Sequence, residues 1–380
     1  MIMTKYFIIA IAALVARAAC TKTEVSTLTP NQAISFQVAN YVGRTRAGES
    51  LFPMDSTFKT SSWFHENATA AAQAFMDNET VKWQSTNSTW GTDRAYFWPK
   101  TGWINFFSWT GYPQPTSVTE GNVTYTNAVI ATDSNPMVAS AAYHYAKNEN
   151  VYAGDDYKYN GTDVEGVPTL FHHLVSQVNV IVKFDASDIS DTNYKWDLVI
   201  EADTLNYANA GSLAINFVDP AAKGQNWPLT SPAINWTRSA SANVDLVGTD
   251  NLAEANKQTT TAGQVSAGKN LFTAISVLPQ DLTATTGSAA KFSIKYTLTS
   301  YYNNVQHIKE TVVLGGNDAI ALTNFKYDNS GTPATLDAWN TNYRYTYILT
   351  IKPNKTVTFD PVVEQWVDEP NQPGYTYPNE

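Results

Sequence analysis

The sequence predicts an all-β protein, and two observations carry this prediction. The 380 residues are 13% aromatic and only 15% charged, against about 25% charged in an average soluble domain. Aromatic and β-branched residues suit the pleated, half-buried surface of a strand. Short apolar runs also alternate with polar residues and are separated by Gly, Asn, Asp and Pro, a spacing that is typical of β-sandwiches.

The expected strands follow from this alternation in chain order. The first is 33–38, where Ile34, Phe36 and Val38 alternate with polar residues and would share one buried face. The aromatic stretch 96–112 indicates two strands that meet at 99–102. Further strands are expected at 178–184, 194–202, 271–278, 291–301, 311–314, 343–351 and 356–363. An Ala-rich run at 68–76 is the best helical candidate in the first half.

Residues 1–20 have the pattern of a lipoprotein signal peptide. Lys5 precedes the apolar run FIIAIAALVA at 7–16, which is shorter than the about 20 residues that cross a bilayer. Cys20, the single cysteine, follows two alanines and is the expected lipidation site. Ordinary secretion with cleavage after Ala19 is the alternative. With one cysteine, no intramolecular disulfide is expected, so stability must come from core burial and strand pairing.

No motif in the sequence indicates catalysis, a metal or a cofactor. The five histidines lack zinc-ligand spacing, and no nucleophile elbow or phosphate loop occurs. His172 and His173 would face opposite sides of a strand and could not chelate together. Asp155-Asp156 and the pair Asp188/Asp191 could form a calcium loop or a carboxylate pair, but solvated turns are the favoured interpretation. The net charge of −10 without a basic block argues against nucleic acid as a partner. We therefore expect a protein that is not an enzyme.

The tryptophans between residues 83 and 109 allow two interpretations. Exposed rings could stack on sugars, whereas buried rings would belong to the core. Trp103, Phe107 and Trp109 would share one strand face, and Ile104 and Phe106 the other. Because both faces are apolar, the core interpretation is favoured. The tryptophans concerned are Trp83, Trp90, Trp98, Trp103 and Trp109.

A series of short motifs runs in order along nearly the whole chain. They are Ile34-Ser35-Phe36 with Thr45-Arg46-Ala47; Phe97-Trp98-Pro99 with Ile104-Asn105-Phe106-Phe107; Phe171, His173, Leu174, Ser176 and Val178; Leu278-Pro279-Gln280; and Trp339-Asn340, Asn342-Tyr343, Tyr345 and Tyr347 with Val363 and Trp366. Taken together they resemble the fimbrillin family, the type V pilins and related surface lipoproteins of Bacteroides-type bacteria. Two features depart from the family pattern. Arg17 stands where its lipobox usually has Leu, and the Arg44/Arg46 doublet leaves the cleavage point open.

The resemblance implies two tandem transthyretin-like β-sandwich domains. The expected division is 1–20 as signal peptide, 21–46 as a propeptide with a removable first strand, 47–186 as the N-terminal domain and 187–380 as the C-terminal domain with an exposed tail. It also implies export to the outer membrane and cell surface through a lipid on Cys20, and cleavage by an Arg-specific surface protease at Arg46 or Arg44.

Cleavage would release the strand of Ile34, Phe36 and Val38, and a strand of a neighbouring pilin subunit would fill the groove by donor-strand exchange. The candidate donor strand carries Val357, Phe359 and Val362, and the alternating residues of 345–351 offer a second pattern; both could equally be ordinary last strands of a monomer. The expected function is a structural subunit of a pilus (fimbria) that serves adhesion and biofilm formation, with a host or glycan receptor as a further partner. The alternative is a monomeric surface lipoprotein that binds glycans through its aromatic residues.

Overall fold

The computed structural model describes residues 33–40, 50–67, 69–99, 102–144, 149–150, 166–216, 236–239, 243–247, 257–283, 290–329 and 332–365. Strands account for the regular structure of these ranges apart from a 3-10 turn at Gly316–Asp318. The predicted all-β class is therefore confirmed. No helix within the described ranges is long and apolar enough to cross a membrane.

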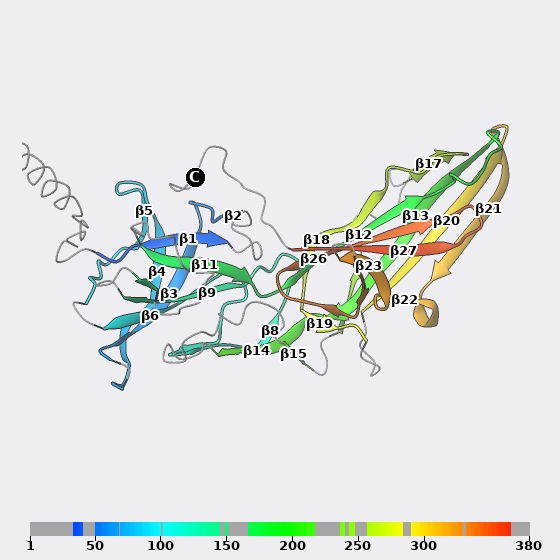
Figure 1. Ribbon diagram of the computed structural model, residues 1–380. Coiled ribbons are helices and arrows are strands. Elements are labelled where there is room, and N and C mark those ends of the chain that lie inside the picture. Colours follow the sequence, from blue (N-terminus) through cyan, green and yellow to red (C-terminus); the bar gives the residue numbers. More distant parts are fainter. Residues whose placement is uncertain are drawn as a thin grey trace, which may run out of the picture.

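The N-terminal strands form one sheet that closes on itself, and they gather at the left of Figure 1. The hydrogen-bonded order is β9 (Met137–His144), β11 (Val167–His173), β1 (Phe36–Asn40), β5 (Thr89–Thr92), β4 (Gln73–Gln84), β3 (Thr57–His65) and β6 (Trp103–Thr110). Because β6 pairs again with β9, these strands form a closed ring. Two short strands extend it, with β2 (Ser50–Leu51) on β1 and β10 (Glu149–Asn150) on β9.

The C-terminal strands form two larger sheets at the right of Figure 1. The first has the order β18 (Lys269–Val277), β12 (Ser176–Phe184), β26 (Tyr343–Ile351) and β27 (Val357–Gln365). The second has the order β16 (Asn243–Val247), β13 (Tyr194–Ala208), β20 (Lys291–Tyr302) and β21 (Val305–Leu314), with β17 (Lys257–Thr261) on β13 and β22 (Ile320–Ala321) on β20.

Smaller sheets complete the described part of the fold. One joins β7 (Ser117–Thr119) and β8 (Asn122–Val129) to β14 (Ala210–Asn216) and β15 (Thr237–Arg238). It links the two larger groups of strands, because β8 follows the ring strand β6 and β14 follows β13 along the chain. The other two pair β19 (Gln280–Asp281) with β25 (Ala338–Trp339), and β23 (Phe325–Asn329) with β24 (Thr332–Leu336).

The buried apolar side chains fall into three clusters. One lies inside the ring and includes Ile34, Phe36 and Val38. A second covers the other face of β6 and includes Phe107 and Trp109 with side chains of β8 and β14. The third fills the space between the two large C-terminal sheets, in the manner of a β-sandwich. β12 belongs to this third cluster through its valines and Phe184, although it precedes residue 186. The division into two domains at that residue remains a prediction.

The alternating runs predict the strands correctly, and the helical candidate is wrong. The runs at 178–184, 194–202, 291–301, 311–314 and 343–351 lie in strands, and those at 271–278 and 356–363 match strands except for Leu278 and Thr356 at one end. Residues 73–84 form β4, which pairs with β3 and buries Met76 and Val81 in the ring. An isolated helix this short is marginal in water, so pairing with β3 decides the structure. In the aromatic stretch, 103–110 is a strand, while Phe97 makes only an isolated bridge with Ala33.

Candidate functional site

β1 closes the ring by lying between β11 and β5. It runs parallel to β11, with Phe36–Asn40 opposite Val167–Phe171, and meets β5 at the single pair of Phe36 and Trp90. Before the strand proper, the N–H of Ile34 donates to the carbonyl of Tyr96 at 2.7 Å. Without β1, the facing edges of β11 and β5 would lose their hydrogen-bond partners. We call the space that β1 fills the β1 seat.

The side chains of the predicted released strand all point into the ring. Ile34, Phe36 and Val38 are 4%, 2% and 5% exposed, while Ser35 and Gln37 face the other side and are half-buried. This is the alternation that the sequence predicts. Full burial of one such side chain contributes about 1.5–3 kcal/mol. Burial of the three together therefore stabilises β1 in the ring.

The chain that follows β1 is fixed in the core by its own contacts. Arg44 and Arg46 lie outside the described residues, as do their neighbours 41–49. On their C-terminal side, Phe52 is buried and stacks on Phe171, with ring centroids 5.1 Å apart. It also contacts Trp90 edge-on at 5.4 Å. A cut at either arginine would therefore separate β1 from a segment that Phe52 holds in the core, although Ser50–Leu51 also pair with β1.

The candidate donor strand β27 is an edge strand of the four-stranded sheet. It pairs antiparallel with β26 along its whole length and has no second neighbour in that sheet. Val357 and Phe359 are half-buried against the C-terminal core, and the ring of Phe359 stacks on Phe325 at 5.4 Å. Val362 is 40% exposed, because its position in the strand turns it to the opposite face. On the face of Val357 and Phe359, the next apolar residues are Pro361 and Val363.

The second alternating pattern lies in a central strand. β26 has β12 on one side and β27 on the other, and Tyr345, Tyr347, Leu349 and Ile351 are all buried. The indole N–H of Trp339 donates to the hydroxyl of Tyr347 at 2.9 Å. Burial raises the pKa of both tyrosines well above the ordinary value. These side chains build the core of the C-terminal sheets, and removing β26 would open that core from both sides.

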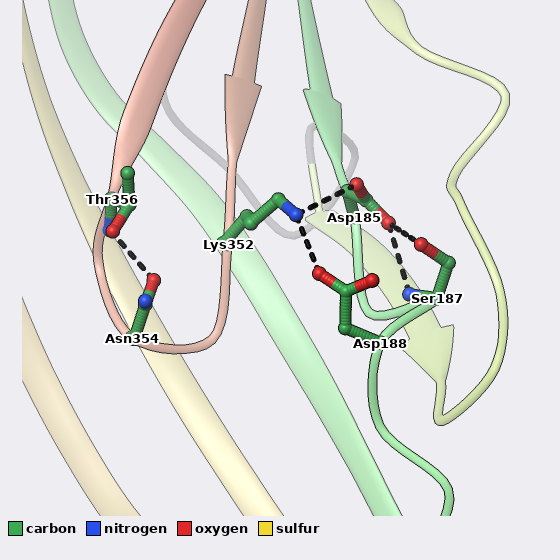
Figure 2. A network of polar contacts seen from close by, with 6 residues as sticks. All are labelled: Asp185, Ser187, Asp188, Lys352, Asn354 and Thr356. Atoms are coloured by element: carbon green, nitrogen blue, oxygen red, sulfur yellow. Dashed lines mark hydrogen bonds and ion pairs between the residues drawn. The ribbon is translucent and has the colours of Figure 1, made fainter.

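A network of polar contacts holds the turn between β26 and β27 (Figure 2). Lys352 Nζ lies 2.6 Å from Asp188 Oδ2 and 3.6 Å from Asp185 Oδ2. Asp185 Oδ1 also accepts from the N–H and hydroxyl of Ser187, and these bonds together with Lys352 hold the pKa of Asp185 below its usual value. Because Lys352 directly follows β26 and Asp185 directly follows β12, the network ties the end of β26 to the end of β12.

The acidic pairs of the sequence have separate partners where they are described. Asp188 pairs with Lys352, whereas Asp191 accepts hydrogen bonds from Asn193 within its own turn. Asp155 and Asp156 lie outside the described residues. Within the described ranges, no group of three or more His, Cys, Asp or Glu side chains is placed to hold a metal ion.

Both adjacent histidines are buried at the end of β11. His173 Nδ1 lies 2.6 Å from Asn135 Oδ1. His172 is 3% exposed, and burial, together with the neighbouring His173, lowers the pKa of His172 to about 3. The imidazole of His172 is therefore neutral at physiological pH, as expected of a histidine that packs in a core.

The five tryptophans between residues 83 and 109 are buried or half-buried, which favours the core interpretation. Trp90 and Trp109 are buried, and Trp83, Trp98 and Trp103 are half-buried. Trp83 packs on Trp90 at 5.8 Å, and Trp103 stacks on His65 at 5.0 Å with the rings nearly parallel. The two faces of β6 enter different clusters, with Phe106 inside the ring and Phe107 outside it. Among the described tryptophans, none presents an exposed ring for a sugar.

Several residues of the site escaped the sequence analysis. Phe58 packs edge-on against the ring of Phe36, as does Phe106, which the aromatic stretch had already singled out. Phe52 anchors the chain after the basic segment. Gly166 lies against the backbone of β1. The sequence gives no sign of this approach, because the residues that Gly166 meets in space, Ser35, Phe36 and Gln37, are far away along the chain. Cys20 lies outside the described residues.

The chain is similar to several solved structures over 88–89% of its length. No family model and no curated protein matches the sequence. A fimbrial protein from Bacteroides vulgatus is 17% identical, with 89% of this chain covering 100% of that one at a TM-score of 0.49. A putative cell adhesion protein from Parabacteroides distasonis is 11% identical, with coverages of 88% and 100% and a TM-score of 0.43.

A third solved structure belongs to the same group. It is the tip fimbrial protein from Porphyromonas gingivalis with a C-terminal truncation, which is 12% identical, with coverages of 89% and 99% and a TM-score of 0.33. These structural neighbours are fimbrial and cell adhesion proteins.

Proposed function

We propose that this chain is a structural, non-enzymatic subunit of a cell-surface pilus, assembled by proteolytic release of β1 and donor-strand exchange. The observation that carries the proposal is the place of β1. With Ile34 just before it, this short strand places three side chains in the core. It fills a gap between β11 and β5, and a segment with two arginines follows it.

The energetics of the β1 seat support an exchange that needs cleavage. Burial of Ile34, Phe36 and Val38 contributes about 5–9 kcal/mol before the entropy of ordering the strand is subtracted. While β1 is covalently attached, it also has a high effective concentration at the seat. Cutting the chain at Arg44 or Arg46 removes that advantage. A second strand with similar apolar side chains could then replace β1 by β-augmentation.

The incoming strand in this proposal is β27 of a neighbouring subunit. β27 lies at the edge of its sheet, and its Val357 and Phe359 are only half-buried. To leave its own subunit, it would therefore break its hydrogen bonds to a single strand, β26. Val363 continues that apolar face, whereas Val362 lies on the opposite one. Export as a lipoprotein through Cys20, placement at the outer membrane, adhesion and biofilm formation belong to the same proposal.

Limited trypsin treatment of the full precursor tests this function. We expect the first cut at Arg44 or Arg46, identified by N-terminal sequencing, and then a ladder of oligomers by size-exclusion chromatography with light scattering. An Arg44→Ala/Arg46→Ala variant is the matched control and should stay monomeric. Excess synthetic peptide of residues 33–40 should stop growth by refilling the seat. A cleaved, folded chain that remains monomeric at high concentration would show that donor-strand assembly is wrong.

The lipid anchor has its own test. Wild-type precursor expressed in a host with lipoprotein export should incorporate labelled palmitate and partition to the membrane. In Cys20→Ala, both the label and the partition should be lost. If the variant still partitions to the membrane, plain secretion without a lipid on Cys20 is the better account.

A further inference from the structure

The start of β11 approaches the backbone of β1 where residue 166 has no side chain. Gly166 is buried, and the N–H of the next residue, Val167, donates to the carbonyl of Ser35 at 2.7 Å. A Cβ on Gly166 would lie 2.9 Å from the carbonyl carbon of Phe36 and 3.0 Å from the nitrogen of Gln37. Its third neighbour, at 3.1 Å, would be the carbonyl oxygen of Ser35.

All three of these neighbours are main-chain atoms of the segment that runs into β1. Real Cβ atoms essentially never approach another heavy atom within 3.0 Å, and a backbone cannot rotate aside as the end of a side chain can. A methyl group at residue 166 would therefore push against the strand in the seat. The three atoms nearest to this methyl group include none from the other strands of the ring.

We propose that Gly166 is the positioning residue of the β1 seat and determines whether a strand can occupy it. The inference rests on the proposed function, since it concerns the site at which strands would exchange. With glycine at residue 166, a strand can lie close enough to β11 to form its parallel ladder. With any larger residue, these three contacts strain the occupied seat, and an empty seat is free of them.

The seat also fixes the register of its occupant. Phe36 lies opposite Val167, and its ring meets Phe58 and Phe106 edge-on at 5.6 Å and 5.7 Å. An occupant must therefore bring a large apolar ring to this point, with apolar side chains two residues to either side. The partner that fits is an extended segment of this pattern. In this chain, Val357-Thr358-Phe359 repeats the order of Ile34-Ser35-Phe36.

Two substitutions elsewhere provide matched controls for Gly166→Ala. In β5, a Cβ on Gly91 would also come within 3.0 Å of another atom, but that atom is the amide nitrogen at the flexible end of Gln84. In β14, a Cβ on Gly211 would lie 2.8 Å from the carbonyl oxygen of Thr237, which is backbone remote from the seat. Gly91→Ala tests a small insertion in the same ring, and Gly211→Ala tests strain in a different sheet.

The experiment measures occupancy of the seat directly. Hydrogen exchange of the intact full chain measures the protection of residues 33–40. In the trypsin-cut chain, a fluorescent peptide of residues 33–40 takes the place of β1, and a chase with excess unlabelled peptide measures how fast the bound label leaves. In Gly166→Ala, we expect protection of residues 33–40 to fall at least tenfold and bound peptide to be chased out at least tenfold faster. Gly91→Ala should match wild type, and Gly211→Ala should lose protection near residues 210–216 and 237–238 only.

These readouts do not depend on polymerisation, so they separate the inference from the proposed function. Equal protection and equal chase rates in Gly166→Ala and wild type would overturn the role of Gly166, whether or not the chain forms oligomers. Loss of the near-ultraviolet circular dichroism of the whole chain in Gly166→Ala would also overturn it, because the strain should be confined to β1. Normal peptide chase in a wild-type chain that never polymerises would instead overturn the pilus proposal alone.

Discussion

The ring of Phe36 lies edge-on to the ring of Phe58, with centroids 5.6 Å apart and an angle of 84° between the planes. This contact joins the first strand of the described chain to β3 across the interior of the ring. Edge-to-face pairs of this kind stabilise by about 0.5–1.5 kcal/mol beyond the burial of their area. Phe36 therefore contributes more to holding β1 than its neighbours Ile34 and Val38.

Replacing the central side chain should loosen β1. Phe36→Ala should lower the free energy of unfolding by about 3–5 kcal/mol, the range for a large aromatic residue removed from a core. Chemical denaturation measures the loss. Gln37→Ala is the control, because this side chain faces away from the ring interior and its amide oxygen is buried without a hydrogen-bond partner. A Phe36→Ala variant as stable as Gln37→Ala would contradict the burial of Phe36.

The stability of the fold should decrease as the pH falls below about 6.5. His172 has a pKa of about 3 in the folded protein, below its ordinary value of 6.5. Below pH 6.5 the unfolded chain takes up a proton that the folded chain does not, so the folded state loses up to about 1.4 kcal/mol per pH unit until pH 3. Denaturation at pH 7 and pH 5 measures this difference.

The contribution of His172 can be isolated by substitution. His172→Gln should reduce the loss of stability between pH 7 and pH 5, and the exposed His307 provides the control, since His307→Gln should leave it unchanged. If both variants show the wild-type pH dependence, the burial of His172 is not its cause.

The tryptophans of β6 should differ in their effect on stability. Trp109 is 5% exposed and packs in the cluster outside the ring, so Trp109→Ala should cost about 3–5 kcal/mol. Trp103 is half-buried and stacks on His65, so its loss should cost less. Urea denaturation of both variants measures the order, and a reversed order would place Trp103 deeper in the core than Trp109.

The Lys352 network should hold the turn between β26 and β27 in place. Lys352 pairs with Asp188 and Asp185, and both contacts raise the pKa of Lys352. Lys352→Ala should therefore increase hydrogen exchange at the β26–β27 turn, with a smaller increase at high salt, where the ion pairs of the wild type are already screened. Lys355→Ala, which removes an exposed pair with Glu310, is the control for loss of charge. Equal exchange in wild type and Lys352→Ala would show that the network does not hold the turn.

The sequence alone determined which segments become strands and which side chains of a strand share a face. Ile34, Phe36 and Val38 alternate with polar residues, and the chain buries this face because successive side chains of a strand point to opposite sides. The same local rule located β12, β13, β20 and β26. It failed for 68–76, where an Ala-rich run gave no sign that residues 73–84 pair with β3.

Only the tertiary structure decided which strands lie side by side. β1 closes the ring against β11, more than 120 residues away along the chain, and Gly166 matters because the backbone of β1 passes directly over it. The same holds for β27, where the register against β26 places Val357 and Phe359 on the core face and Val362 on the other. Periodicity along a chain encodes the faces of a single strand. The partner of each strand depends instead on shape and on buried contacts between distant residues.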